Sequence, residues 1–142
     1  MERFFTDKKV NPDELSPLTL AFIGDTVFDL LVREELICQA NRPPNDLHRL
    51  AVDKVKASAQ AGFIETLLPH LDAKETAIYK RGRNAKSGHL PKNANQRDYH
   101  MATGFEALIG YLYLSNRLDR ITELYILLNE NKGVCVHEKR EH

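Results

Sequence analysis

Apolar residues recur with helical spacing along nearly the whole chain, and this periodicity limits what the sequence can fold into more than any other feature. No stretch alternates between apolar and polar residues for long enough to predict a strand. At 142 residues the chain can bury one hydrophobic core but is too short for two ordinary ones. We therefore expect one all-α domain, a helical bundle spanning residues 1–142.

Capping residues and prolines divide this pattern into helices. Ser16 followed by Pro17 predicts the start of a helix that runs to about Cys38. After Pro43 and Pro44, a second helix is predicted over residues 46–68 with Asn45 as its cap, and Pro69 ends it.

Three further helices are expected in the second half of the chain. Asp72 and Glu75 form a capping box for a short helix that ends at about Arg81. A further helix contains Glu106, and a last one spans roughly residues 118–129. The tail from about 132 to 142 is expected to be weakly ordered.

The composition excludes several other classes of protein. Charged residues interrupt every apolar run well before it could span a bilayer, so we expect no membrane segment. The first residues do not have the pattern of a secretory signal, and the two cysteines, Cys38 and Cys135, form no metal or redox motif. We therefore expect a cytoplasmic protein.

Two apolar helical runs each contain one carboxylate, Asp25 in residues 20–27 and Glu106 in residues 104–114. An ionised carboxylate inside a packed layer of helices is costly unless it is paired or bound to a cation. If the two helices pack with Asp25 facing Glu106, their oxygens can share one Mg²⁺. Such an ion would polarise a phosphodiester and help to generate hydroxide at neutral pH.

A helical wheel leaves a simpler interpretation open for the first run. One arc is apolar and the opposite arc is polar; the apolar arc holds Leu20, Ile23, Val27, Leu30 and Leu31, and the polar arc holds Asp25, Thr26, Asp29 and Arg33. Asp25 could then belong to an ordinary row of charges at a spacing of four residues, and Glu106 could simply be hydrogen-bonded to a neighbouring helix. Phe22 projects among the polar groups, which indicates that a second subunit or another surface covers them.

One segment is basic although the chain has no net charge. Residues 80–97 contain six Lys or Arg and no Asp or Glu, whereas residues 1–79 contain nine Lys or Arg and thirteen Asp or Glu. The six basic residues are Lys80, Arg81, Arg83, Lys86, Lys92 and Arg97. This segment, which we expect to be a loop, is either a solvated connector or a surface that binds nucleic acid.

The two carboxylate-containing runs resemble the two signatures of the ribonuclease III family. Residues 20–27, Leu-Ala-Phe-Ile-Gly-Asp-Thr-Val, resemble Glu-Phe-Leu-Gly-Asp-Ala-Val, and residues 104–114 resemble Asp-x-Phe-Glu-Ala-Leu-Ile-Gly-Ala-x-Tyr-Leu. The resemblance implies the helical bundle of the ribonuclease III endonuclease domain. It also places Asp25 on the catalytic aspartate of the family and Glu106 on its metal-binding glutamate.

The resemblance further implies an activity and an assembly. Members of the family cleave double-stranded or structured RNA in a reaction that depends on Mg²⁺, for which we expect Mn²⁺ can substitute. They act as homodimers with the helix of the first signature at the interface, which would explain Phe22.

The chain departs from the family pattern at two positions. Ala21 stands where the first signature usually has Glu, and Thr103 stands where the second usually has Asp, which argues against a fully occupied two-metal site. The chain also leaves no room for the usual C-terminal double-stranded-RNA-binding domain. It is therefore similar to the short Mini-III branch of the family, which consists of the catalytic domain alone.

Similarity to Mini-III implies a substrate and a partner. The substrate would be the precursor of the large-subunit (23S) ribosomal RNA, and the candidate protein partner is a ribosomal protein on the pre-ribosome. The six basic residues of segment 80–97 would then bind the RNA in place of the absent domain. Lys54 and Lys56 could extend that surface, although solvated helix lysines are the simpler interpretation.

Two alternatives remain for the function. A catalytically inactive RNA-binding or ribosome-assembly protein could keep the ribonuclease III fold after losing acidic residues at positions 21 and 103. Retention of Asp25 and Glu106 favours the enzyme. An all-α nucleotide pyrophosphohydrolase would need a Glu-x-x-Glu pair on one of the predicted helices, and these helices lack it.

Overall fold

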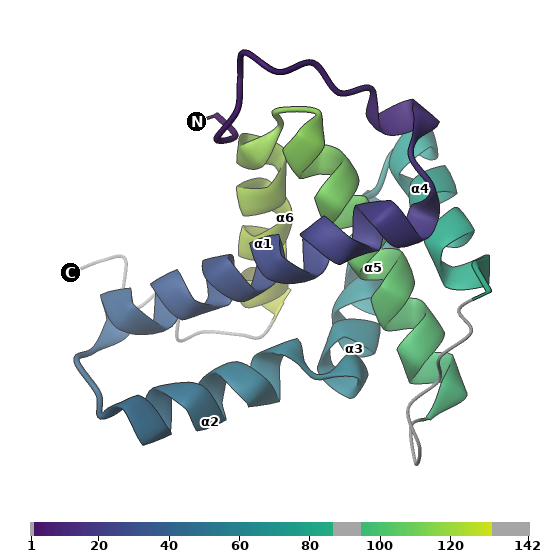
Figure 1. Ribbon diagram of the computed structural model, residues 1–142. Helices are drawn as coiled ribbons and strands as arrows, with labels where there is room; N and C mark the ends of the chain where they lie inside the picture. The colour runs from purple at the N-terminus through teal and green to yellow at the C-terminus, as the bar shows by residue number, and fades with distance from the viewer. Residues whose placement is uncertain (1, 87–94, 132–142) are drawn as a thin grey trace.

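The structure is a computed structural model that describes residues 2–86 and 95–131. Every regular element in these two ranges is a helix, which confirms the all-α prediction (Figure 1). The helices are α1 (Pro17–Gln39), α2 (Pro44–Val55), α3 (Ala57–Leu67), α4 (Ala73–Asn84), α5 (Gln96–Leu114) and α6 (Leu118–Asn131), with short 3₁₀ turns at Pro12–Glu14 and Leu68–His70. No helix in the described ranges is both long enough and apolar enough to cross a membrane.

Helix α5 is the centre of the bundle. It contacts α1, α3, α4 and α6, and Figure 1 shows α1 crossing over it. Phe105 of α5 meets Phe28 of α1 edge to face, with 4.9 Å between ring centroids, and Phe63 of α3 joins this pair. Edge-to-face aromatic contacts of this kind add to the stabilisation from burial.

Two helix starts predicted from capping residues are confirmed, whereas the predicted cap Asn45 lies inside α2, which begins at Pro44. The side chain of Ser16 accepts a hydrogen bond from the backbone N–H of Thr19 at the start of α1. Asp72 and Glu75 form both bonds of the capping box at the start of α4. Helix α4 continues to Asn84, so the helix end predicted at about Arg81 lies too early in the chain.

The single helix predicted over residues 46–68 is wrong, because the chain breaks it into α2 and α3. Lys56 has an extended backbone, with φ −64° and ψ 156°. The buried side chain of Gln60 donates a hydrogen bond of 2.7 Å to the carbonyl of Val55, which would otherwise lack a helical partner. The break lets α2 pack against α1 while α3 packs against α5.

The buried face of α1 also differs from the apolar arc of the wheel. Its buried residues are Leu20, Ala21, Gly24, Phe28, Val32 and Leu36. Leu30, which the wheel placed on the apolar arc, is 55% exposed. The buried face of α1 is the one on which small residues let α5 approach closely. A helical wheel ranks residues by hydrophobicity and therefore does not identify that face.

Two glycines set the distance between α1 and α5. A Cβ atom on Gly24 would lie 1.7 Å from the carbonyl oxygen of Glu106, and a Cβ on Gly110 would lie 1.9 Å from the carbonyl oxygen of Leu20. Both distances are far inside van der Waals contact, and the opposing atoms belong to the backbone. The two helices can therefore cross at this point only because both residues lack a side chain.

A buried ion pair joins α4 to α6. Glu75 is almost fully buried, and its two carboxylate oxygens lie 2.8 Å from Nε and 2.8 Å from Nη2 of Arg120. Arg120 Nη2 also donates to the carbonyl oxygen of His70. The Arg120 guanidinium holds the pKa of Glu75 below its ordinary value, so the carboxylate stays charged inside the bundle.

The glycine crossing gives a stability prediction. Gly24→Ala and Gly110→Ala should each lower the free energy of unfolding by about 3 kcal/mol or more, because a methyl group would overlap backbone atoms of the facing helix. Gly62→Ala on α3 is the matched control, since a Cβ there meets nothing within 4 Å. It should raise stability by about 0.5–1 kcal/mol. Urea unfolding of the three variants measures this, and equal effects at positions 24, 62 and 110 would contradict the close crossing.

Candidate active site

The crossing of α1 and α5 brings Asp25 and Glu106 together. Asp25 follows Gly24 in the chain, and Glu106 is the residue whose carbonyl oxygen lies against Gly24. The Asp25 side chain lies within hydrogen-bonding reach of the Glu106 carboxyl group. Asp25 is exposed and Glu106 is half-buried, so the pair is open to solvent on the side of Asp25.

This proximity changes the acidity of Glu106. Burial raises its pKa, and the neighbouring Asp25 carboxylate raises it further, to about 8. A hydrogen bond from Gln60 acts in the opposite direction. Two carboxylates this close favour either a shared proton or a bound cation.

Gln60 is a third member of the site, and the sequence analysis missed it. Its side chain is 1% exposed, and its Nε2 donates to Glu106 Oε2 at 3.1 Å as well as to the carbonyl of Val55. Its Oε1 is buried and has no hydrogen-bond partner among the described residues. An unsatisfied buried polar atom costs about 1–3 kcal/mol, which makes this arrangement unusual for a purely structural glutamine.

The residues present fit a hard divalent cation. Asp25 and Glu106 bring carboxylate oxygens from two helices together, and Mg²⁺ is usually held by one or two carboxylates together with water or phosphate oxygens. The described residues contain no group of three or more His, Cys, Asp or Glu that could hold a metal. Any cation here would therefore depend on two carboxylates.

The two positions that depart from the family pattern have other roles. Ala21 is buried in a small cluster with Leu20, Ile78 and Ala107. Thr103 turns its hydroxyl to the carbonyl of Tyr99 in its own helix, at 3.0 Å. Neither position places an acidic group in the site.

The charge row proposed as the simpler interpretation forms only in part. Arg33 Nε lies 3.0 Å from Asp29 Oδ1 on the surface of α1. None of the ion pairs between described residues involves Asp25. The contact of Asp25 with Glu106 therefore sets it apart from its neighbours on α1.

The sequence predicted a loop for the basic segment, residues 80–97, but the structure places part of this segment in helices. Lys80, Arg81 and Arg83 lie on α4, Lys86 follows that helix, and Lys92 is outside the described residues. Arg97 lies in the first turn of α5, and its Nη2 pairs with Glu65 Oε1 at 2.7 Å.

The two lysines considered as an extension of this surface are engaged in ion pairs on other parts of the molecule. Lys54 Nζ lies 2.8 Å from Glu35 Oε1, and the Tyr125 hydroxyl donates to the same oxygen at 2.5 Å. This partly buried cluster ties α1, α2 and α6 together. Lys56 Nζ lies 3.7 Å from Asp53 on the surface.

Phe22 projects from α1 and is 81% exposed in this chain. An apolar groove lies nearby between α1 and α6; its lining includes Ile23, Val27, Leu30, Ile121 and Ile126. A large exposed aromatic residue beside an apolar groove is typical of an interaction surface.

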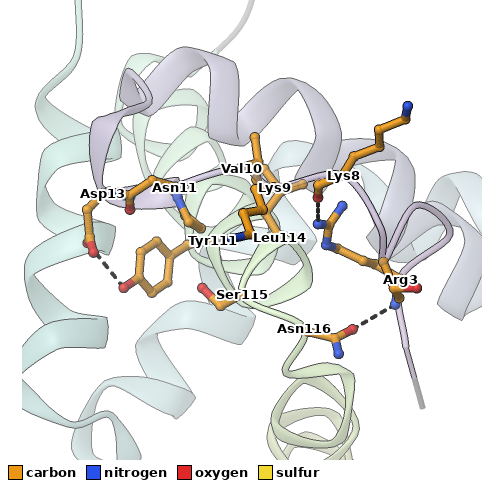
Figure 2. A pocket seen from close by; sticks show the side chains of 12 residues that line it. Arg3, Lys8, Lys9, Val10, Asn11, Asp13, Tyr111, Leu114, Ser115 and Asn116 are labelled. Carbon is orange, nitrogen blue, oxygen red and sulfur yellow. Dashed lines mark hydrogen bonds between the residues drawn. The ribbon is translucent and has the colours of Figure 1, made fainter.

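A second pocket lies at the end of α5, between the N-terminal segment and the turn into α6. Figure 2 shows Asp13 and Arg3 anchored there: the Tyr111 hydroxyl donates to Asp13 Oδ1 at 3.2 Å, and the backbone N–H of Arg3 donates to Asn116 Oδ1 at 2.8 Å. Asp25 and Glu106 do not line this pocket. Its polar contacts fasten the N-terminal segment to the bundle.

The amino-acid sequence is similar to those of known proteins of one family. The model of the ribonuclease III domain matches residues 18–117, which include both carboxylates and Gln60. The chain is 50% identical to Mini-ribonuclease 3 of Brevibacillus brevis over 114 residues, covering 80% of this chain and 85% of the relative. It is 41% identical to Mini-ribonuclease 3 of Clostridium tetani over 140 residues, covering 94% and 93%.

The fold has a counterpart among solved structures. A crystal structure of a protein from Fusobacterium nucleatum superposes with a TM-score of 0.75 at 28% sequence identity, covering 84% of this chain and 96% of that one. Taken with the family match and the relatives, this likeness confirms the ribonuclease III resemblance: the chain belongs to the ribonuclease III family and is an endoribonuclease of the ribonuclease III type.

Proposed function

We propose that this endoribonuclease cleaves double-stranded or structured RNA in a reaction that depends on Mg²⁺, with Asp25 and Glu106 as its catalytic pair. The observation that carries the proposal is the contact between these carboxylates, one from each family signature, at the closest point of α1 and α5. Membership of the ribonuclease III family supports the same assignment.

The two carboxylates would hold the cation from different depths. Glu106 is half-buried and fixed by Gln60, so it provides a rigid ligand. Asp25 is exposed, so its carboxylate faces the side from which a phosphodiester can approach. Mg²⁺ bound there would polarise the phosphodiester and lower the pKa of a water molecule. Mn²⁺ takes similar oxygen ligands and should replace it.

The main rival is a catalytically inactive RNA-binding or ribosome-assembly protein. The observation that favours it is the absence of acidic groups at Ala21 and Thr103. The close contact of Asp25 and Glu106 favours catalysis, because a protein that only binds RNA gains nothing from two repelling carboxylates.

The proposed substrate is the precursor of the large-subunit (23S) ribosomal RNA, in the cytoplasm, with a ribosomal protein on the pre-ribosome as candidate partner. Similarity to several Mini-ribonuclease 3 proteins supports this choice. Arg81, Arg83 and Lys86 at the end of α4, together with Lys80, Lys92 and Arg97, would contact the RNA backbone.

The proposed assembly is a homodimer. Phe22 would insert into apolar surface of the second copy, and the groove between α1 and α6 offers such a surface. Burial of one aromatic side chain contributes about 1.5–3 kcal/mol, and two-fold symmetry doubles the contribution.

Charge-removing variants test the catalytic pair. Asp25→Asn and Glu106→Gln should each abolish cleavage of long double-stranded RNA while leaving RNA affinity nearly unchanged, because the amide keeps the shape and removes the charge that holds the cation. High Mg²⁺ or Mn²⁺ should partly rescue Glu106→Gln. Sizing of the products with and without Mg²⁺ measures this; full turnover by either variant at ordinary Mg²⁺ would contradict the assignment.

Proton and cation compete for the same pair, which gives a pH prediction for metal-free protein. The pKa of Glu106 is about 8 in the folded state and near the ordinary 4.5 when unfolded. The folded state therefore binds the proton more tightly, and stability should fall as pH rises from about 4.5 to about 8. Glu106→Gln should lack this loss, and Mg²⁺ should reverse it in the parent at pH 8. Urea unfolding in EDTA measures the effect, and identical pH profiles for parent and variant would contradict it.

Sedimentation velocity tests the dimer. Phe22→Ser should weaken dimerisation at least about 100-fold, since about 3 kcal/mol or more is lost over the two copies. Val52→Ser on α2, where Val52 is also an exposed apolar residue, should leave the dimer intact. A parent protein that sediments as a monomer at micromolar concentration would argue against the interface.

Salt dependence tests the basic residues. Replacing Arg81, Arg83 and Lys86 together by Ala should weaken RNA binding. It should also flatten the dependence of binding on salt, because each phosphate contact releases counterions. KM should rise more than kcat falls, because the contact that is lost binds substrate and transition state equally. Replacing Arg33, Arg49 and Lys56 by Ala is the control, since these residues lie outside α4 and each pairs with an acidic residue three or four positions earlier in the chain. An unchanged salt slope in the first triple variant would show that the RNA binds elsewhere.

A further inference from the structure

We infer that Gln60 is a positioning residue that orients Glu106 for cation binding, an inference that rests on the proposed function. Its amide joins three helices at one point: Gln60 lies on α3, its Nε2 donates to the last carbonyl of α2, and the same nitrogen donates to Glu106 Oε2 on α5. These two contacts measure 2.7 Å and 3.1 Å.

The surroundings dictate the orientation of the amide. The carbonyl of Val55 only accepts hydrogen bonds, and so does an ionised Glu106 carboxylate. The NH₂ group must therefore face both of them, and the oxygen must face the other way. Because Val55 is the last residue of α2, the break between α2 and α3 provides the fixed carbonyl that holds the amide in place.

Packing alone does not account for this residue. Gln60 is 1% exposed, and its Oε1 has no partner within the described part of the chain. An apolar side chain of similar length would fill the same volume without burying an unpaired oxygen. A hydrogen bond from the Gln60 amide that holds Glu106 in place would explain why a polar side chain is buried here.

The inference agrees with how proteins tune metal ligands. Carboxylates that bind metals are commonly held by hydrogen bonds from a second layer of residues, and removing such a partner weakens metal affinity about 10- to 100-fold. This site depends on two carboxylates, so the orientation of each one matters more than it would in a site with four.

Binding of Mn²⁺ to the full-length protein without RNA tests the inference. The electron paramagnetic resonance signal of free Mn²⁺ measures binding directly and does not depend on cleavage. Gln60→Met keeps the length and removes the amide, so it should weaken Mn²⁺ binding about 10- to 100-fold. It should also raise the Mg²⁺ concentration for half-maximal cleavage by a similar factor while leaving KM for RNA unchanged. Gln39→Met, at the exposed end of α1, is the matched control and should bind like the parent.

Three outcomes separate the possibilities. If Gln60→Met binds Mn²⁺ within twofold of the parent, even with a lower melting temperature, Gln60 is only a structural link and the inference is wrong. If Asp25→Asn binds Mn²⁺ as well as the parent does, the cation site of the proposed function is wrong. If Gln60→Met does not fold, Gln60→Asn replaces it: this shorter amide cannot span from Val55 to Glu106, so it should also lower affinity, and parent-like affinity would overturn the inference.

Discussion

The contact between the backbones of α1 and α5 is the constraint on which the rest of this structure depends. Because Gly24 and Gly110 have no side chain, a carbonyl oxygen of the facing helix can occupy the space that a Cβ atom would fill at each position. The same crossing buries the core around Phe28 and Phe105 and places Asp25 against Glu106. The stability of the bundle and the geometry of the site therefore have one origin. A helix pair held at an ordinary distance by larger side chains would separate the two carboxylates.

The site costs the fold some stability. In the metal-free protein, a half-buried Glu106 lies beside a second carboxylate, and the oxygen of Gln60 is buried without a partner among the described residues. Both features are unfavourable in a structure that only needs to fold, and a bound cation would relieve the repulsion between the two carboxylates. Elsewhere the bundle satisfies its buried charges, as Arg120 does for Glu75 and Lys54 for Glu35. This contrast distinguishes the site from the structural ion pairs.

The break at Lys56 links the local backbone to the site. By ending α2 early, the chain frees the carbonyl of Val55, and the Gln60 amide uses that carbonyl and Glu106 at once. A continuous helix over residues 46–68 would have used the Val55 carbonyl internally. The departure from the expected helix thus supplies one of the contacts that hold Glu106.

Sequence reasoning succeeded where a local signal determines the structure. Ser16 and the pair of Asp72 and Glu75 marked helix starts, because a side chain there satisfies backbone groups a few residues away. It failed where tertiary contact decides. No Gly or Pro marks the break at Lys56, and Leu30 is exposed although it is apolar, since α5 packs against the small residues of α1. Both carboxylates were found from their apolar surroundings, but Gln60 was not, because a neutral residue on a helix of small residues gives no signal of its own.

The central claim is that Asp25 and Glu106 together hold one catalytic cation. Crystals of the parent protein grown with Mn²⁺ and measured at the manganese absorption edge test it most directly. The account predicts an anomalous-scattering peak between the two carboxylates, within coordination distance of an oxygen from each. A peak bound elsewhere, or none between these residues in crystals of a protein that cleaves RNA with Mn²⁺, would contradict it.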